Sequence, residues 1–174
     1  MINSSLNPAY QYTPYQKGNC VKNIHTFDNN IKVYEHHFYE FQQKRYQKKN
    51  VHEPVEEDLF MRLVETFSTE SFVFFDIGAA IGYYPILMKR LRPDAIIEAF
   101  EPLTMHRAYM QENFALNEID TSSITIRDIA LSNYNGTTKF IENQYGSSLV
   151  GMPPLKPGWR GHLHSTLSIS SSIT

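Results

Sequence analysis

The chain has 174 residues, of which 41% are hydrophobic and 20% are charged, so its composition is that of a globular domain and excludes general disorder. The formal net charge is −2, which gives no overall positive field to attract nucleic acid or an anionic membrane. Cys20 is the single cysteine and excludes an intrachain disulfide. Residues 1–19 lack the features of a signal peptide, and no apolar run approaches the roughly 20 residues that span a bilayer. The sequence therefore favours a cytoplasmic protein.

Residues 1–52 are predicted to form an N-terminal arm and a helix. Asn, Tyr, Pro and Gly without a sustained period make residues 1–30 a loose arm. A short extended or mixed segment follows from Ile31 to Phe41, and then comes a basic helix candidate, Gln42–Asn50. Its basic and aromatic residues suit phosphate contacts, but the solvated face of a helix is the commoner role of such a segment.

The central part of the chain alternates predicted helices and strands. Pro54–Phe67 has a proline and acids suited to a first helical turn, followed by apolar residues at helical spacing. The order then is strand (SFVFFDIG), helix (YYPILMKRL), strand (AIIEAF), helix (LTMHRAYMQENFAL) and strand (SSITIRDIAL). This alternation predicts an α/β fold with a parallel sheet in the order third, second, first strand, with helix Pro54–Phe67 near the ligand-binding edge. The continuous apolar run of the first strand predicts burial on both faces.

Beyond the third predicted strand, the pattern is less regular. Asn135 and Gly136 form a turn signal, which predicts a hairpin between the third strand and the next β-prone run. Residues 151–174 are predicted to be a linker and an irregular tail. Their alternative is a terminal strand beside the first strand, because several apolar residues share one parity: Leu163, Leu167, Ile169 and Ile173.

An acid and two glycines stand between the first predicted strand and its helix: Asp76, Gly78 and Gly82. Ligands of parallel sheets bind beyond the carboxyl ends of the strands, where glycine lets a ligand approach the backbone. Glu101 ends the next strand, near the interval of about 20 residues at which adenosine sites carry an acid for the ribose. The alternative is that the glycines only pack and that the acid is merely exposed. Asp76 would repel a diphosphate and attract an ammonium group, which favours S-adenosylmethionine over NAD.

With these motifs the chain resembles the FkbM family of class I S-adenosylmethionine-dependent methyltransferases. The resemblance covers about Glu53 to Val150 and carries D-x-G-A-x-x-G-Y, A-F-E-P and A-L-S in order. Ala80 and Pro85 depart from the residues usual in the family, Asn and a small polar residue. The resemblance implies a Rossmann-like cofactor domain over residues 53–150. It implies a cofactor site made of Asp76, Gly78, Ala79, Gly82 and Tyr83 at the methionine end, Glu101 at the ribose, and Asp128 with Ile129 at the adenine.

The resemblance also implies O-methylation of a hydroxyl on a sugar or another small metabolite. For Asp128 the alternative is simple pairing with Arg127 or solvent. His106, His162 and His164 are available bases, but no catalytic residue is assigned. His162 and His164 are interpreted as surface residues, so no metal site is predicted.

The K-x-D-x-E-G motif that ends the fourth strand in FkbM-like proteins is absent, so the C-terminal strands of the fold are incomplete. Three interpretations stay open: a fragment, a minimal fold that a partner completes, or a noncatalytic remnant that binds cofactor. An NAD-dependent oxidoreductase is a further, less favoured alternative.

Without the missing C-terminal strands, the first strand would have an uncovered edge, which predicts self-association. The other predicted partner is a small-molecule or glycan acceptor.

Overall fold

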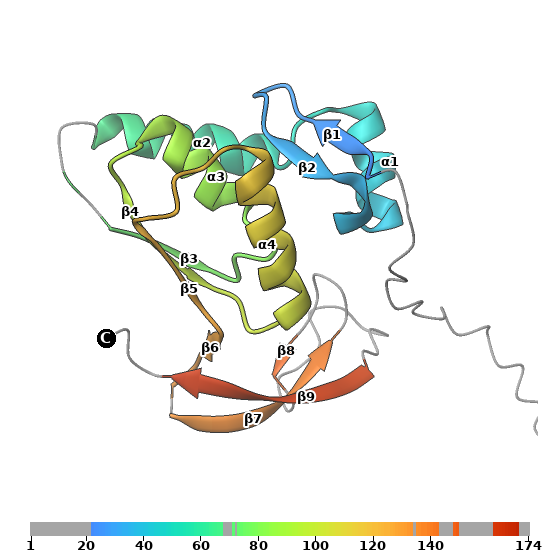
Figure 1. The fold of residues 1–174 in the computed structure, drawn as a ribbon, viewed down its shortest axis with the longest axis vertical. Coiled ribbons are helices and arrows are strands. Elements are labelled where there is room, and N and C mark those ends of the chain that lie inside the picture. Colours follow the sequence, from blue (N-terminus) through green and yellow to red (C-terminus); the bar gives the residue numbers. More distant parts are fainter. Residues whose placement is uncertain are drawn as a thin grey trace, which may run out of the picture.

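The structure is a computed structural model, and it describes residues 22–67, 71, 73–133, 135–142, 148–149 and 162–170. The described chain contains three parts: a parallel sheet with helices, an N-terminal unit beside those helices, and a second sheet formed by the C-terminal part (Figure 1). Residues 1–21 of the predicted arm and residues 151–161 of the predicted linker lie outside the described residues. Among the described residues, none of the helices combines the length and the hydrophobicity of a transmembrane span.

Three parallel strands form the central sheet: β3 (Val73–Ile77), β4 (Ile96–Phe100) and β5 (Ile124–Arg127). Their order is β3-β4-β5, with Ile77 opposite Phe100 and Phe100 opposite Arg127. This topology confirms the predicted α/β class, the parallel pairing and the strand order. In the described part of the chain β3 has β4 as its one strand neighbour, so its other edge is unpaired.

Three helices cover one face of this sheet: α2 (Pro54–Thr66), α3 (Tyr83–Leu91) and α4 (Thr104–Leu116). Ile97 and Ala99 of β4 point into the two hydrophobic clusters that these helices complete. Helix α2 runs beside α3, because Tyr84 Oη donates to Glu53 Oε2 at 2.9 Å at one end and Arg92 Nη1 donates to Phe67 O at 3.2 Å at the other. Only the first turn of α2 is therefore near the carboxyl edge of the sheet.

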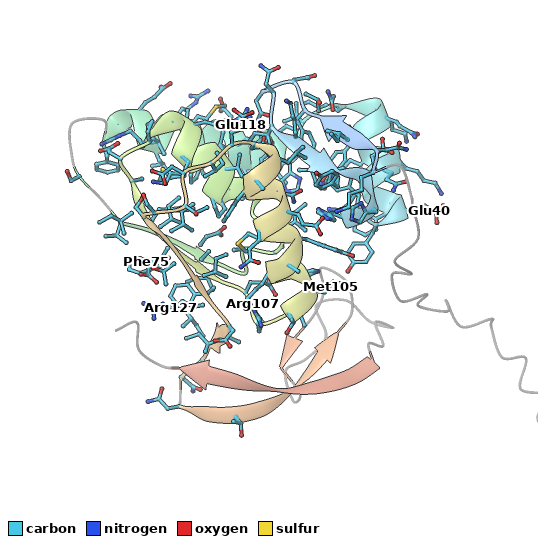
Figure 2. The ribbon with its side chains drawn as sticks, in the orientation of Figure 1. Glu40, Phe75, Met105, Arg107, Glu118 and Arg127 are labelled. Carbon is cyan, nitrogen blue, oxygen red and sulfur yellow. The ribbon has the colours of Figure 1, made fainter. Side chains whose placement is uncertain are left out.

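The opposite face of the sheet is largely open, and the predicted burial of the first strand on both faces is wrong. Val73, Phe75 and Ile77 alternate with half-buried residues and are exposed. Figure 2 shows Phe75 and Arg127 on the side of the sheet away from the helices. A continuous apolar run predicts burial only when both faces have a covering layer, and the described residues place helices on one face alone.

An N-terminal unit packs against α3 and α4. It consists of strands β1 (Ile24–Thr26) and β2 (Lys32–Tyr34), a short 3-10 helix η1 (Glu35–His37) and helix α1 (Glu40–Lys48). The prediction of a loose arm up to residue 30 missed β1, whereas α1 confirms the basic helix. Phe27 and Val33 share one hydrophobic cluster with Met110, so this unit is continuous with the core of the central sheet. The predicted boundary at residue 52 stays a prediction.

The C-terminal part forms a second sheet below the first (Figure 1). Its strands are β6 (Ile129–Leu131), β7 (Gly136–Glu142), β8 (Ser148–Leu149) and β9 (His162–Ser170), in the order β6-β9-β7-β8. The third predicted strand is thus split at Asp128. The predicted hairpin is wrong, because β9 lies between β6 and β7, and the terminal strand lies in this sheet and not beside β3. Such long-range pairing overrides a local turn signal.

Candidate functional site

The register of the central sheet brings the predicted acids to one edge. Gly78, Glu101 and Asp128 each follow directly after one of the paired residues Ile77, Phe100 and Arg127. The three positions therefore end adjacent parallel strands at the carboxyl edge, where open α/β sheets bind ligands. Asp76 lies one residue before the end of β3, and its side chain points to the helix-covered face, as the alternation along the strand requires.

The loop between β3 and α3 turns through three left-handed residues. Gly78, Ala80 and Gly82 have φ values of 83°, 46° and 81°. The amides of Gly78 and Ala79 donate to Phe100 O at 2.9 and 3.1 Å, which fastens the loop to the end of β4. Ala80 holds a conformation that carries a steric cost for a residue with a Cβ, so the loop is a strained segment at the candidate site.

The two glycines of the loop have different surroundings. A Cβ on Gly82 would stand 2.5 Å from Met110 Cγ and 2.9 Å from Phe114 Cε1, so α4 packs against its backbone. A Cβ on Gly78 would meet no atom of the described part of the chain within 4 Å. Gly82 is therefore required for packing, whereas Gly78 leaves open space beside the strand ends.

Asp76 carries an unsatisfied oxygen beneath this loop. The residue is half-buried, but its Oδ2 has no contact with solvent and makes no hydrogen bond among the described residues. Burial, with a smaller contribution from the charge of Glu101, raises the pKa of Asp76 to about 7. A buried acceptor without a donor is costly, so this oxygen would gain from a ligand that brings a donor or a positive charge.

Glu101 is buried and already organises the loop. Its Oε2 accepts a hydrogen bond from Ala80 N and its Oε1 one from Leu103 N, both at 2.9 Å. His106 Nδ1 lies 3.5 Å from Oε1, and the Glu101 residue is 4% exposed. These amide partners could not be predicted from the sequence, because they depend on the left-handed turn at Ala80. His106, a candidate base in the sequence, is buried next to Glu101.

The remaining predicted site residues differ in position. Asp128 is exposed between β5 and β6, and Ile129 begins β6 and is half-buried. The side chain of Tyr83 turns away from the strand ends: Asn29 Nδ2 donates to its hydroxyl at 2.8 Å, and its ring lies 4.2 Å from that of His52. The structure thus gathers Asp76, Gly78, Ala79, Gly82, Glu101 and Asp128 at one edge and separates the Tyr83 ring from them.

A cavity of about 380 Å³ lies elsewhere, between the N-terminal unit and the start of α2. None of the strand-end residues lines it. Because the predicted cofactor residues do not face it, we do not assign it to the candidate site. Its lining includes Asp28, Asn29, Asn50, Pro54, Glu57 and Met61.

Comparisons with known proteins give one partial similarity to report. No protein-family model matches the chain, and the comparison with curated proteins gave no match. A solved structure, the SAM-dependent methyltransferase from Agrobacterium tumefaciens, is similar with a TM-score of 0.38 and 13% sequence identity. The match covers 47% of this chain and 32% of that chain, so it spans about a third of the other protein. A similarity of this extent carries no argument about function, and membership of the FkbM family stays a prediction.

Proposed function

We propose that the protein is an S-adenosylmethionine-dependent methyltransferase that binds its cofactor at the carboxyl edge of β3-β4-β5. The observation that carries this proposal is the buried Oδ2 of Asp76, which makes no hydrogen bond to the described residues, next to the space that they leave open at Gly78. An ammonium group such as that of the methionine moiety would supply both a donor and an opposite charge there. The residues present therefore fit this cofactor.

The other residues of the edge have matching roles in the proposal. Glu101 accepts from the ribose hydroxyls through the second lone pairs of its oxygens, or in place of the Ala80 and Leu103 amides. Asp128 accepts from the exocyclic amine of adenine, with Ile129 as its apolar neighbour. Tyr83 contributes backbone only, because its side chain packs with the N-terminal unit.

The bound cofactor would supply an activated methyl group, so the contribution of the chain is to position the acceptor and to take up its proton. We propose FkbM-type O-methylation of a hydroxyl on a sugar or small metabolite, in the cytoplasm. His106 is enclosed beside Glu101, which suits a positioning residue better than a base that meets the acceptor. No base is assigned.

A second candidate is a protein that binds the cofactor without transferring the methyl group. The observation that favours it is the central sheet, which has three strands in the described part of the chain. A methyl-transfer assay against a panel of hydroxylated acceptors separates the two candidates. Turnover of any acceptor supports the enzyme, and cofactor binding without turnover supports the second candidate.

Calorimetry with S-adenosylmethionine and S-adenosylhomocysteine tests the site itself. Glu101→Ala removes two hydrogen bonds to a charged group, so binding should weaken by about 2 to 4 kcal/mol. Glu98→Ala is the matched control, because Glu98 lies on β4, three residues before Glu101, but pairs with Arg127 on the open face. Equal affinity of Glu101→Ala and wild type would remove the ribose assignment, and binding of NAD in place of the methionine cofactors would favour an oxidoreductase.

We also propose that a second copy of the chain pairs with the edge of β3. This edge is unpaired in the described part of the chain, and Val73 and Ile77 beside it are exposed and apolar. An exposed apolar edge strand is a template for pairing with another chain.

A further inference from the structure

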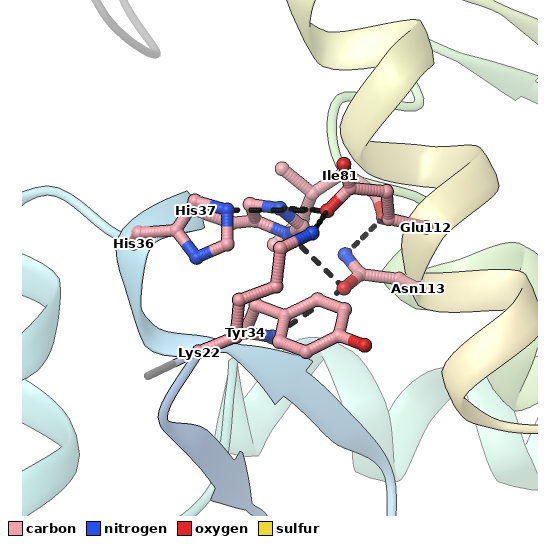
Figure 3. A network of polar contacts seen from close by, with 7 residues as sticks. All are labelled: Lys22, Tyr34, His36, His37, Ile81, Glu112 and Asn113. Atoms are coloured by element: carbon pink, nitrogen blue, oxygen red, sulfur yellow. Dashed lines mark hydrogen bonds and ion pairs between the residues drawn. The ribbon is translucent and has the colours of Figure 1, made fainter. Parts of the chain in front are cut away.

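Two histidines and a glutamate converge where the N-terminal unit meets α4. His36 and His37 lie on η1, and Glu112 lies on α4 (Figure 3). Glu112 Oε2 is 3.4 Å from His37 Nε2 and 3.9 Å from His36 Nε2. One ligand atom from each residue can be chosen so that all three lie within 4.8 Å of one another. No short motif or residue spacing in the sequence predicts this cluster, because the glutamate comes from a helix that is distant along the chain.

The tautomer of His37 follows from its neighbour Asn113. Asn113 Nδ2 faces the Ile81 carbonyl at 3.0 Å, which only accepts, so this atom must be the donating nitrogen of the amide. The other amide atom is then the oxygen, 3.0 Å from His37 Nδ1. His37 therefore donates from Nδ1, and its Nε2 keeps a lone pair.

In the neutral ring this lone pair faces Glu112 Oε2 at 3.4 Å, and the contact is an ion pair only when the ring is protonated. The His37 side chain is completely buried, and its Nε2 has no hydrogen-bond partner among the described residues. Two acceptors that face each other at 3.4 Å leave a position that a cation would stabilise.

We propose that His36, His37 and Glu112 form a binding site for one divalent metal ion of the zinc type. Two imidazole nitrogens and one carboxylate oxygen are ligands that Zn²⁺ uses in proteins, with a fourth position left for water. Ligand atoms of a tetrahedral zinc site are about 3.3 to 3.5 Å apart, so the His37 and Glu112 atoms already stand at the required separation. His36 and Glu112 are partly exposed, which leaves the fourth position accessible to solvent.

The neighbours of His37 are of the kind that usually surround a histidine bound to a metal. A histidine that binds a metal usually donates its other ring nitrogen to a fixed acceptor, and Asn113 is that acceptor here. The Tyr109 ring stacks on His37 at 3.9 Å and further fixes the orientation of the imidazole. Lys22 Nζ lies 2.9 Å from the same Glu112 oxygen, so a metal ion would compete with this ammonium group for the carboxylate.

Titration of the full-length chain, without a histidine tag, with Zn²⁺ in a calorimeter and with Co²⁺ in a spectrophotometer tests this site. We expect one ion per chain and the visible absorption of four-coordinate Co²⁺. His36→Ala and Glu112→Gln should each weaken binding at least about tenfold. Glu118→Gln, an exposed carboxylate beyond the end of the same helix, is the control and should bind as wild type does.

A gain of affinity separates a lost ligand from a lost fold. Lys22→Met removes the competing ammonium while it keeps all three ligands, so Zn²⁺ should bind several-fold more tightly than to wild type. Far-ultraviolet circular dichroism of each variant checks that the chain folds. Absence of Zn²⁺ binding to wild type, or equal affinity of wild type and the folded His36→Ala and Glu112→Gln variants, would overturn the proposal.

Discussion

The two faces of the central sheet differ although their sequences are similarly apolar. On β4, Ile96 is 51% exposed and its neighbour Ile97 is 0% exposed. Ile97 faces α2 and α3, whereas Ile96 faces the same side as Val73 of β3. At these two positions the apolar residue that faces the helices is buried, and the one that faces away from them is half in solvent. The helix-covered face also holds the buried carboxyl group of Asp76 in the candidate site, so the core and this part of the candidate site share one face.

The largest difference in stability is expected between substitutions of these two isoleucines. Ile97→Ala leaves a cavity between the sheet and the helices, and we expect a loss of about 2 to 5 kcal/mol in the free energy of unfolding. Ile96→Ala removes a side chain that is half in solvent, and we expect a loss of about 1 kcal/mol or less. Urea denaturation measures both values. Similar losses would mean that the open face is covered in solution.

The buried carboxyl group of Asp76 on the helix-covered face should make the free energy of unfolding depend on pH, and this is the second-largest effect that we expect. The pKa of Asp76 is about 7 in the folded chain and about 4 when unfolded, so the folded chain holds more protons between these values. The free energy of unfolding should therefore fall as the pH rises from about 4 to about 7. Asp76→Asn has no such loss, and relative to pH 4 it should gain about 2 to 4 kcal/mol over wild type at pH 8.

Thermal or urea unfolding of both proteins from pH 4 to pH 8 measures this gain. The same variant should bind S-adenosylmethionine more weakly, because an amide does not attract an ammonium group. Parallel stability curves for wild type and Asp76→Asn would contradict the burial of a charge at this position.

Much of the central sheet was predictable because its signals are local. Continuous apolar runs, glycines and strand-end acids follow one another along the chain, and the parallel order β3-β4-β5 follows from helices that alternate with strands. The carboxyl edge with Asp76, Glu101 and Asp128 was predictable for the same reason. What each side chain does there was not, because the hydrogen bonds of Glu101 depend on the backbone conformation of Ala80.

The parts that the sequence did not predict depend on contacts between distant segments. Strand β1 is three residues long and becomes a strand only by pairing with β2, so no periodicity marks it. Strand β9 pairs with β6 and β7 across a long stretch of chain, which no turn signal indicates. His37 and Glu112 meet only because the N-terminal unit packs on α4.

The two loop glycines are expected to differ in what a side chain would cost at each position. Both have nearly the same positive φ, so Gly78→Ala and Gly82→Ala share a similar backbone strain of about 1 kcal/mol. Gly82→Ala adds a clash with Met110 and Phe114, for which we expect about 1 to 3 kcal/mol more. Denaturation measures the difference, and equal losses would show that α4 moves aside freely. Gly78→Ala should instead weaken cofactor binding, because its methyl group enters the open space at the strand ends.

A substitution on the open face is expected to have the smallest effect on the stability of the single chain. Its main effect should be on the association of two chains. Phe75 is 43% exposed at the centre of β3, so Phe75→Ser should change the free energy of unfolding of the single chain by only about 1 kcal/mol. If a second copy covers this strand, the same change removes an apolar contact between chains, and the dimer should dissociate at higher protein concentration than wild type. Sedimentation velocity over a range of concentrations measures this shift. Val55→Ser is the matched control, since Val55 is exposed on α2 away from the sheet and should leave association unchanged. A wild-type chain that stays monomeric at every concentration would show that the unpaired edge of β3 does not recruit a second copy.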